Sequence, residues 1–157
     1  MSGSTAKTGT SVRLAVDVLA RKENIRLVSD TVQLFLADGA ELRHDEPQAT
    51  KLRLAIMEAV TNVVRHAYAP DPGGPLGVSL ARDGEWITVV LTDTAACFDP
   101  FAEKEQDTGE IAIPDPEQLA IGGYGLGIIK SVMDEVSHRY CDGNELTLRV
   151  KIVPPAE

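Results

Sequence analysis

The sequence predicts a two-layer α/β (α+β) sandwich, in which helices cover one face of a mixed, mainly antiparallel sheet. Three observations carry this prediction. The expected elements follow the order strand, helix, helix, strand, strand, helix, strand. Two consecutive strands are joined by a short polar turn, so they are hairpin neighbours and not parts of a strict strand–helix alternation. The helical segments carry their apolar residues at helical spacing, as expected of helices that pack through one face.

Hydrophobic periodicity defines the first two elements. Residues Ser11–Ala20 carry an aliphatic side chain at every second position from Val12 to Val18, which predicts a strand. Residues Glu23–Leu36 carry apolar side chains at helical spacing, and Gly39 suits the end of such a helix.

The middle of the chain predicts a long helix followed by a hairpin. The periodic segment Gln48–Tyr68 contains several good helix formers. The stretch Pro70–Pro75 holds prolines and glycines and therefore forms a turn. Strands are expected at Leu76–Arg82 and Trp86–Thr92, on either side of the turn Asp83-Gly84-Glu85.

The last third begins with an acidic stretch, Ala102–Ile121, which holds six acidic residues against one lysine and is typical of a loop. The run Gly122–Gly127 follows, with four glycines in six residues. Helical spacing resumes over Ile128–Val136, and the alternating residues of Glu145–Val153 predict a final strand.

Composition limits the possible classes of protein. A chain of 157 residues with 43% hydrophobic residues suits one globular domain, expected over residues 11–157 after a flexible tail at residues 1–10. The net charge of −9 argues against sequence-independent nucleic-acid binding. No apolar run approaches the ~20 residues that span a bilayer. We therefore expect a cytoplasmic protein with no direct nucleic-acid or membrane partner.

Cysteine and histidine usage predicts neither disulfides nor structural zinc. Cys97 and Cys141 are too few for a disulfide framework, and the three histidines lack metal-ligand spacing.

One stripe of polar residues marks the long predicted helix. Glu58, Asn62 and His66 lie four residues apart, and each step turns only about 40° around the helix. The stripe runs along the border of the apolar face, where a carboxylate and an amide can reach into a cleft. An ordinary polar shoulder of the helix would give the same pattern.

Two further features could contact a ligand. Asp93 follows the strand Trp86–Thr92, where a carboxylate could accept a hydrogen bond from an exocyclic amine or simply form a turn. The run Gly122–Gly127 opens onto a helix, whose N-terminus suits phosphate. A flexible hinge is the alternative, because the run matches neither a P-loop nor a dinucleotide-binding fingerprint.

Taken together and in order, these motifs resemble the GHKL ATPase superfamily, and within it the anti-sigma-factor serine/threonine kinases. The resemblance covers about Val12–Val153. It rests on the segment EAVTNVVRHAY from Glu58, the tripeptide FDP from Phe98, the segment GGYGLG from Gly122, and Asn144 before the last strand.

The resemblance implies a Bergerat-type fold that binds ATP with Mg²⁺. Glu58 would be the general base that accepts the proton of a serine hydroxyl. Asn62 would hold Mg²⁺, and Asp93 would bind the adenine amine. The phosphates would be wrapped by Gly123, Gly125, Leu126 and Gly127. The stretch Ala102–Ile121 would form a lid over them. The remaining residues of the expected nucleotide site are His66, Ala95 and Thr147.

Ala95 departs from the family pattern, which usually has glycine two residues after the strand-end aspartate. If that position has positive φ, alanine there is strained by about 1 kcal/mol or more. Such strain would affect nucleotide affinity more than the fold.

The implied function is that of a serine kinase that binds a sigma factor and phosphorylates a small anti-anti-sigma (STAS-type) protein. The resemblance also implies a homodimer that uses the strand Ser11–Ala20, and a partner contact at Arg26. One alternative is a non-catalytic nucleotide-binding or regulatory module that acts by contact alone. Two other classes of the superfamily fit the sequence less well. A histidine-kinase catalytic domain is expected to follow a dimerisation helix, and a gyrase- or Hsp90-like motor is expected to carry a transducer domain.

Overall fold

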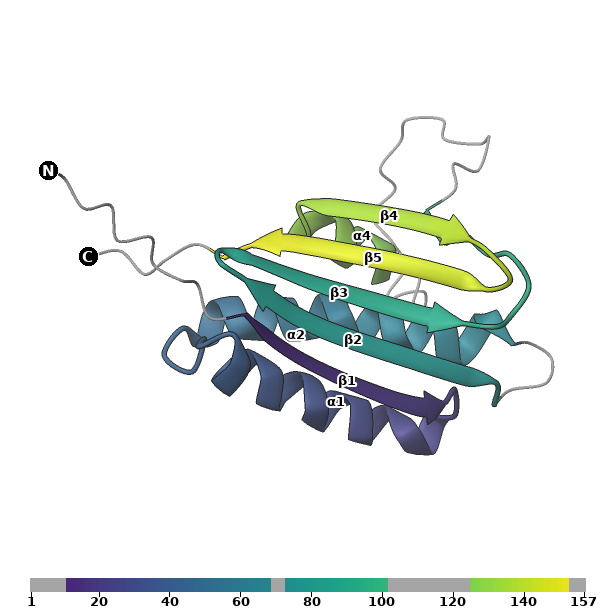
Figure 1. Ribbon diagram of the computed structural model, residues 1–157, viewed down its shortest axis with the longest axis horizontal. Helices are drawn as coiled ribbons and strands as arrows, with labels where there is room; N and C mark the ends of the chain where they lie inside the picture. The colour runs from purple at the N-terminus through teal and green to yellow at the C-terminus, as the bar shows by residue number, and fades with distance from the viewer. Residues whose placement is uncertain (1–10, 69–72, 102–124, 153–157) are drawn as a thin grey trace, which may run out of the picture.

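Five strands form an open antiparallel sheet (Figure 1). The computed structural model describes residues 11–68, 73–101 and 125–152. The strand order is β1-β2-β3-β5-β4, and each of the pairings between neighbours is antiparallel. The predicted sheet is confirmed, with no parallel pair among the described strands. The strands are β1 (Val12–Leu19), β2 (Pro75–Asp83), β3 (Trp86–Asp93), β4 (Glu135–Tyr140) and β5 (Asn144–Lys151).

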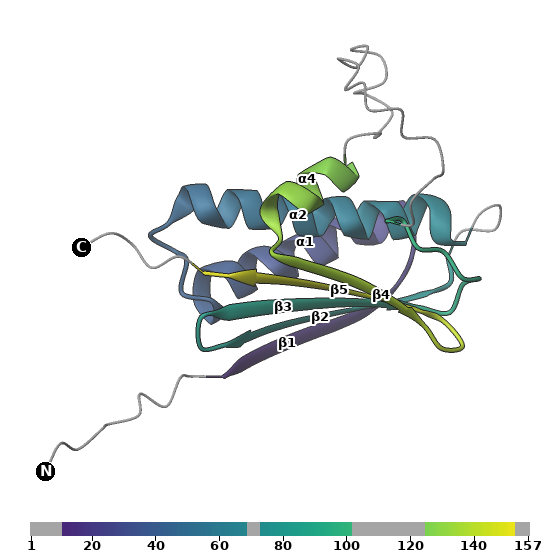
Figure 2. The ribbon, with the colours of Figure 1, turned by 90° about the horizontal axis from the view of Figure 1, so that it is seen from above.

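The helices lie on one face of this sheet, and none of the described helices covers the other face (Figure 2). This arrangement confirms the predicted two-layer sandwich. Within the described ranges, no helix is both long and apolar enough to cross a bilayer. The main helices are α1 (Ile25–Leu34), α2 (Glu46–Asn62) and α4 (Gly125–Val132), and shorter helical turns span Lys22–Asn24, Phe35–Gly39 and Val63–Ala67.

The core lies between the two layers. Alternate residues of β2, β3 and β5 are buried on the helix side, and they meet the buried faces of α1 and α2. Each fully buried aliphatic side chain contributes about 1.5–3 kcal/mol relative to an exposed one. This packing fixes α2 against the helix side of the sheet. Representative core residues are Val28, Val32, Ile56, Val60, Leu80, Val89 and Leu148.

The long helix begins earlier than predicted and changes its geometry near its end. The Asp45 carboxylate caps α2 by accepting a hydrogen bond from the backbone N–H of Gln48 at 3.2 Å. After Asn62 the backbone continues as a π-helical turn over Val63–Ala67. The wider i→i+5 turn rotates the residues that follow it, so the regular helical stripe ends at Asn62.

The C-terminal part corrects one sequence prediction. The helix expected over Ile128–Val136 is α4, which ends at Val132, and Val136 lies in the additional strand β4. The apolar spacing up to Val136 suited a helix. Pairing with β5 along the sheet edge determines the strand instead. Asp134 marks the change, since its backbone N–H donates to the carbonyl of Arg149 at 2.9 Å.

Candidate active site

A small pocket lies where the ends of β3 and β5 meet α2 and the segment 98–101. Its volume is about 30 Å³, well below the ~300–1,000 Å³ of typical small-molecule sites. Its walls are mostly apolar, and they include Leu91, Phe98, Phe101, Ile129 and Leu146. Four polar side chains also line it, namely Asn62, Asp93, His138 and Asn144.

Asp93 has one carboxylate oxygen committed to the protein. Its Oδ1 atom accepts hydrogen bonds from the backbone N–H of Ala95 at 3.0 Å and from Nδ2 of Asn144 at 2.9 Å. Among the described residues, no hydrogen bond reaches Oδ2. The half-buried carboxylate therefore offers one free acceptor to a donor in the pocket.

Ala95 carries no positive-φ strain. The non-glycine residues with positive φ in the described ranges are Glu41 and Asp142. Ala95 is buried, and its N–H bonds to Asp93 without a left-handed backbone. The strain that a positive φ would have imposed on alanine is therefore absent here.

Glu58 and Asn62 project from the last two turns of α2, and both are half-buried. Within the described part of the chain, neither side chain makes a hydrogen bond or an ion pair. Glu58 lies against the first residue of α4, because a Cβ built on Gly125 would be 2.5 Å from Oε2 of Glu58. Only glycine therefore fits at position 125 without displacing the carboxylate. Glu58 itself does not line the 30 Å³ pocket, whereas Asn62 does.

The residues present suit Mg²⁺ only in a site with few protein ligands. Among the described residues, no group of three or more His, Cys, Asp or Glu side chains could hold a metal. Asn62 supplies an uncommitted amide oxygen, and Mg²⁺ usually keeps several waters and binds substrate phosphates as well. The donor set therefore fits a Mg²⁺ ion that arrives with a nucleotide.

Two predicted site residues lie away from the pocket. His66 is exposed on the π-helical turn after α2. Thr147 pairs with Val90 and Ser137 across the sheet, and its side chain lies on the face away from the helices, because its neighbours in β5 are the ones buried toward the helices.

The predicted phosphate-binding residues are described only in part. Gly125 is buried at the start of α4, Leu126 is half-buried and Gly127 is exposed. Gly123 and the acidic stretch Ala102–Ile121 lie outside the described residues, as does the tail at residues 1–10.

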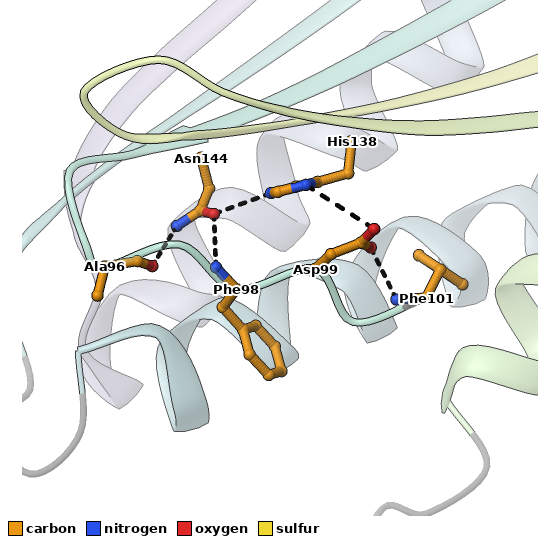
Figure 3. Close-up of polar contacts among 6 residues, drawn as sticks. All are labelled: Ala96, Phe98, Asp99, Phe101, His138 and Asn144. Carbon is orange, nitrogen blue, oxygen red and sulfur yellow. Dashed lines mark hydrogen bonds and ion pairs between the residues drawn. The ribbon is translucent and has the colours of Figure 1, made fainter. Parts of the chain in front are cut away.

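The sequence prediction missed the role of two polar residues in this pocket. Asn144 begins β5 and bonds to Asp93. His138 of β4 bonds to Asn144 (Figure 3). Asn144 contributed to the resemblance, but no pattern assigned it a role. His138 lies in a strand that the sequence did not predict. The signal that was available for Asn144 was its position directly after the turn residues Asp142 and Gly143.

Tyr68, just after the π-helical turn that follows α2, is hydrogen-bonded to the start of β2 and to the residue after β3. Its hydroxyl donates to the carbonyl of Pro75 and accepts from the backbone N–H of Thr94 at 2.8 Å. A side chain at Gly74 would overlap the Tyr68 ring. Tyr68 thus fixes the helix that carries Glu58 relative to the loop after Asp93.

We expect Tyr68→Phe to lower the free energy of unfolding by about 1–2 kcal/mol, because two backbone groups lose their partner. Urea unfolding followed by circular dichroism measures the change. Tyr140→Phe is the matched control, since Tyr140 is 47% exposed and its hydroxyl makes no hydrogen bond among the described residues. Equal stability of the two variants would contradict this role of Tyr68.

A second, wider hollow lies between α1 and the end of α2, with a volume of about 580 Å³. We call it the basic groove, because four cations and one acid line it: Lys22, Arg26, Arg53, Arg65 and Asp30. Arg26 is exposed at the start of α1. Four cations in one place contrast with the net charge of −9 for the whole chain.

The fold and the site define a two-layer α+β domain with a mostly apolar pocket at the strand ends, lined also by four polar side chains. Residues 18–150 match the family described as histidine kinase-like ATPase domain. The chain therefore belongs to this family.

Curated relatives agree with the family match. Serine-protein kinase RsbW of Bacillus subtilis (strain 168) is 36% identical over 86 residues, which cover 54% of this chain and 53% of the relative. The Serine-protein kinase RsbW of Listeria monocytogenes (serovar 1/2a, strain EGD-e) is 33% identical over 96 residues, or 59% of each chain. The chain thus spans little more than half the length of the curated relatives it matches.

Proposed function

We propose that this protein is an ATP-dependent serine kinase of the anti-sigma-factor type. It binds a sigma factor and phosphorylates a small STAS-type protein on serine. One observation carries the proposal. Glu58 and Asn62 present uncommitted polar groups on one side of α2, between the Asp93 pocket and the N-terminal residue of α4. The names of the similar proteins support the same activity.

The adenine base would occupy the Asp93 pocket. The free Oδ2 atom of Asp93 accepts a hydrogen bond from the exocyclic amine, while Leu91, Ile129 and Leu146 contact the faces of the ring. Because the pocket volume is about 30 Å³, the pocket walls must rearrange before a base can enter.

The phosphates would extend from this pocket toward α4. The N-terminal residues of α4, Gly125–Gly127, offer backbone N–H groups, and a helix N-terminus favours negative charge. Asn62 would hold Mg²⁺, which when bound neutralises phosphate charge.

Glu58 would serve as the general base. The serine Oγ forms a bond to the γ-phosphorus of ATP while the bond to the bridging oxygen of ADP breaks. The hydroxyl proton passes to the Glu58 carboxylate, which carries no competing hydrogen bond among the described residues. Incubation with Mg-ATP and candidate STAS-type proteins, followed by mass spectrometry, tests for phosphoserine.

A second candidate is a regulatory module that acts by contact alone. The small pocket volume favours it, because a base cannot enter without rearrangement. In that case the partner is captured equally well with and without ATP, and no phosphoserine forms.

The basic groove is the proposed contact surface for a protein partner. Its cations suit an acidic surface. The guanidinium group of an arginine can also pair with a carboxylate through two parallel hydrogen bonds. The proposed homodimer would instead use β1. This strand lies at the sheet edge, and Leu19 at its end is 43% exposed.

We expect Arg26→Ala to weaken capture of the sigma factor or STAS-type protein by about tenfold or more, as for other interface arginines. Mg-ATP binding should be unchanged, because the basic groove and the Asp93 pocket share no lining residue. Pull-down and calorimetry measure the two effects. Arg139→Ala, on the opposite sheet edge, is the control. Capture by Arg26→Ala that matches this control would exclude the basic groove as the contact surface.

A further inference from the structure

Asn144 is a buried polar residue, with 6% of its surface exposed. Its Nδ2 atom donates to Oδ1 of Asp93 at 2.9 Å and to the carbonyl of Ala96 at 2.8 Å. Its Oδ1 atom accepts from the backbone N–H of Phe98 at 2.9 Å and contacts Nε2 of His138 at 2.8 Å (Figure 3). These four bonds use the full capacity of the amide.

The chemistry of the partners fixes the orientation of this amide. Nδ2 faces a carboxylate and a carbonyl, which are acceptors, while Oδ1 faces a backbone N–H, which is a donor. A flipped amide would place its oxygen against both acceptors. Because Oδ1 is an acceptor, Nε2 of His138 must carry the proton in this hydrogen bond. His138 therefore supports Asn144 as a donor.

The other ring nitrogen of His138, Nδ1, faces the segment 98–101, which lines the pocket. Nδ1 of His138 lies 3.9 Å from Oδ2 of Asp99, whose other oxygen accepts from the N–H of Phe101 at 2.9 Å. With 8% of its surface exposed, the His138 side chain is held between β5 and this segment. Its contacts therefore restrict the direction from which Nε2 can donate to Asn144.

Asn144 in turn determines how Asp93 faces the pocket. Two donors, the Ala95 N–H and Nδ2 of Asn144, converge on Oδ1 of Asp93, so Oδ2 remains as the acceptor for a ligand. We propose that Asn144, held by His138, is a positioning residue that aims Oδ2 at the amine on C6 of a purine, and so sets the preference for adenine. This inference rests on the proposed nucleotide site.

Two nucleotides that differ only at C6 test the proposal on the full chain. ATP carries the amine, and purine riboside 5′-triphosphate carries hydrogen in its place. Calorimetry with Mg²⁺ should show the parent binding ATP about tenfold tighter or more, because a hydrogen bond to a carboxylate is charge-assisted. The ratio of the two affinities is the readout, since general damage to the pocket lowers both affinities together.

Asn144→Leu should bring this ratio close to one, because Asp93 loses a donor. His138→Leu should reduce the ratio in the same direction, and His138→Gln should restore it, since the glutamine amide can donate from about the same place. The histidine pair decides the question if Asn144→Leu does not fold. Glu145→Gln is the control, because this neighbouring side chain lies on the sheet face away from the helices and pairs with Arg139.

A ratio that stays at about tenfold in folded Asn144→Leu, or in His138→Leu, would overturn the positioning role while leaving the nucleotide site intact. A parent protein that binds neither nucleotide would overturn the proposed function, and this inference with it. A parent that binds both nucleotides equally would show that Asp93 does not read the C6 amine.

Discussion

Glu58→Gln is expected to lower the rate of serine phosphorylation by about 10²–10⁴-fold, the contribution typical of a general base. Glutamine has nearly the same shape but cannot accept the serine proton at its amide. Mg-ATP affinity should change little, because the base acts on the acceptor hydroxyl in the transition state and not on the bound nucleotide. Single-turnover phosphotransfer and calorimetry on the same preparations separate the two effects.

Glu46→Gln is the matched control for this variant. It makes the same substitution on the same helix, but at the exposed first turn of α2 and far from Gly125. The control should phosphorylate at close to the parent rate. Phosphorylation by Glu58→Gln at the control's rate would place the base elsewhere, and a matching loss of ATP affinity would assign Glu58 a role in binding.

The second large effect is expected from Asp93→Asn, which should weaken Mg-ATP binding by about tenfold or more. The amide is neutral, so its hydrogen bond to the adenine amine is no longer charge-assisted. If its amino group occupies the place of Oδ1, it also faces two donors, the Ala95 N–H and the Asn144 amide. Calorimetry measures the loss directly.

Asp83→Asn provides the control, because Asp83 ends β2 in the exposed hairpin turn. The position of Asp93 also limits the explanations for a negative result. Asp93 pairs with Asn144 at the end of β3, and both residues line the pocket. Unchanged ATP affinity in a folded Asp93→Asn protein would therefore mean that the base does not bind in this pocket.

Local patterns predicted most of the fold. The hairpin of β2 and β3 and the long helix α2 follow from patterns among residues close in sequence. Strand β4 was missed because its residues Ser137–Tyr140 lack apolar alternation, and its pairing with β5 is what makes it a strand. Periodicity cannot predict an element that depends on such a neighbour.

The relative positions of candidate residues were predictable where they lie on one regular helix. Glu58 and Asn62 lie one turn apart on α2, and both are half-buried there. His66 lies beyond the π-helical turn, where the 3.6-residue period no longer holds. The face of the sheet on which Thr147 lies depends on the exact position of the residue in β5, since a shift of one residue moves a side chain to the other face.

Contacts between distant segments were not accessible from the sequence. Asn144 meets Asp93, which lies 51 residues earlier in the chain. The sequence around either residue does not predict that contact. The absence of positive φ at Ala95 is likewise a backbone property that residue identity alone does not determine.

The most direct test of the nucleotide site is a crystal structure of the full chain with Mg²⁺ and a non-hydrolysable ATP analogue. We expect the purine to lie in the pocket lined by Leu91, Ile129 and Leu146, with its C6 amine bound to Oδ2 of Asp93. We also expect the phosphates at the N-terminal end of α4, with Mg²⁺ bound by Asn62. A nucleotide in the basic groove beside Arg26, or a purine that leaves Asp93 without a contact, would contradict this expectation.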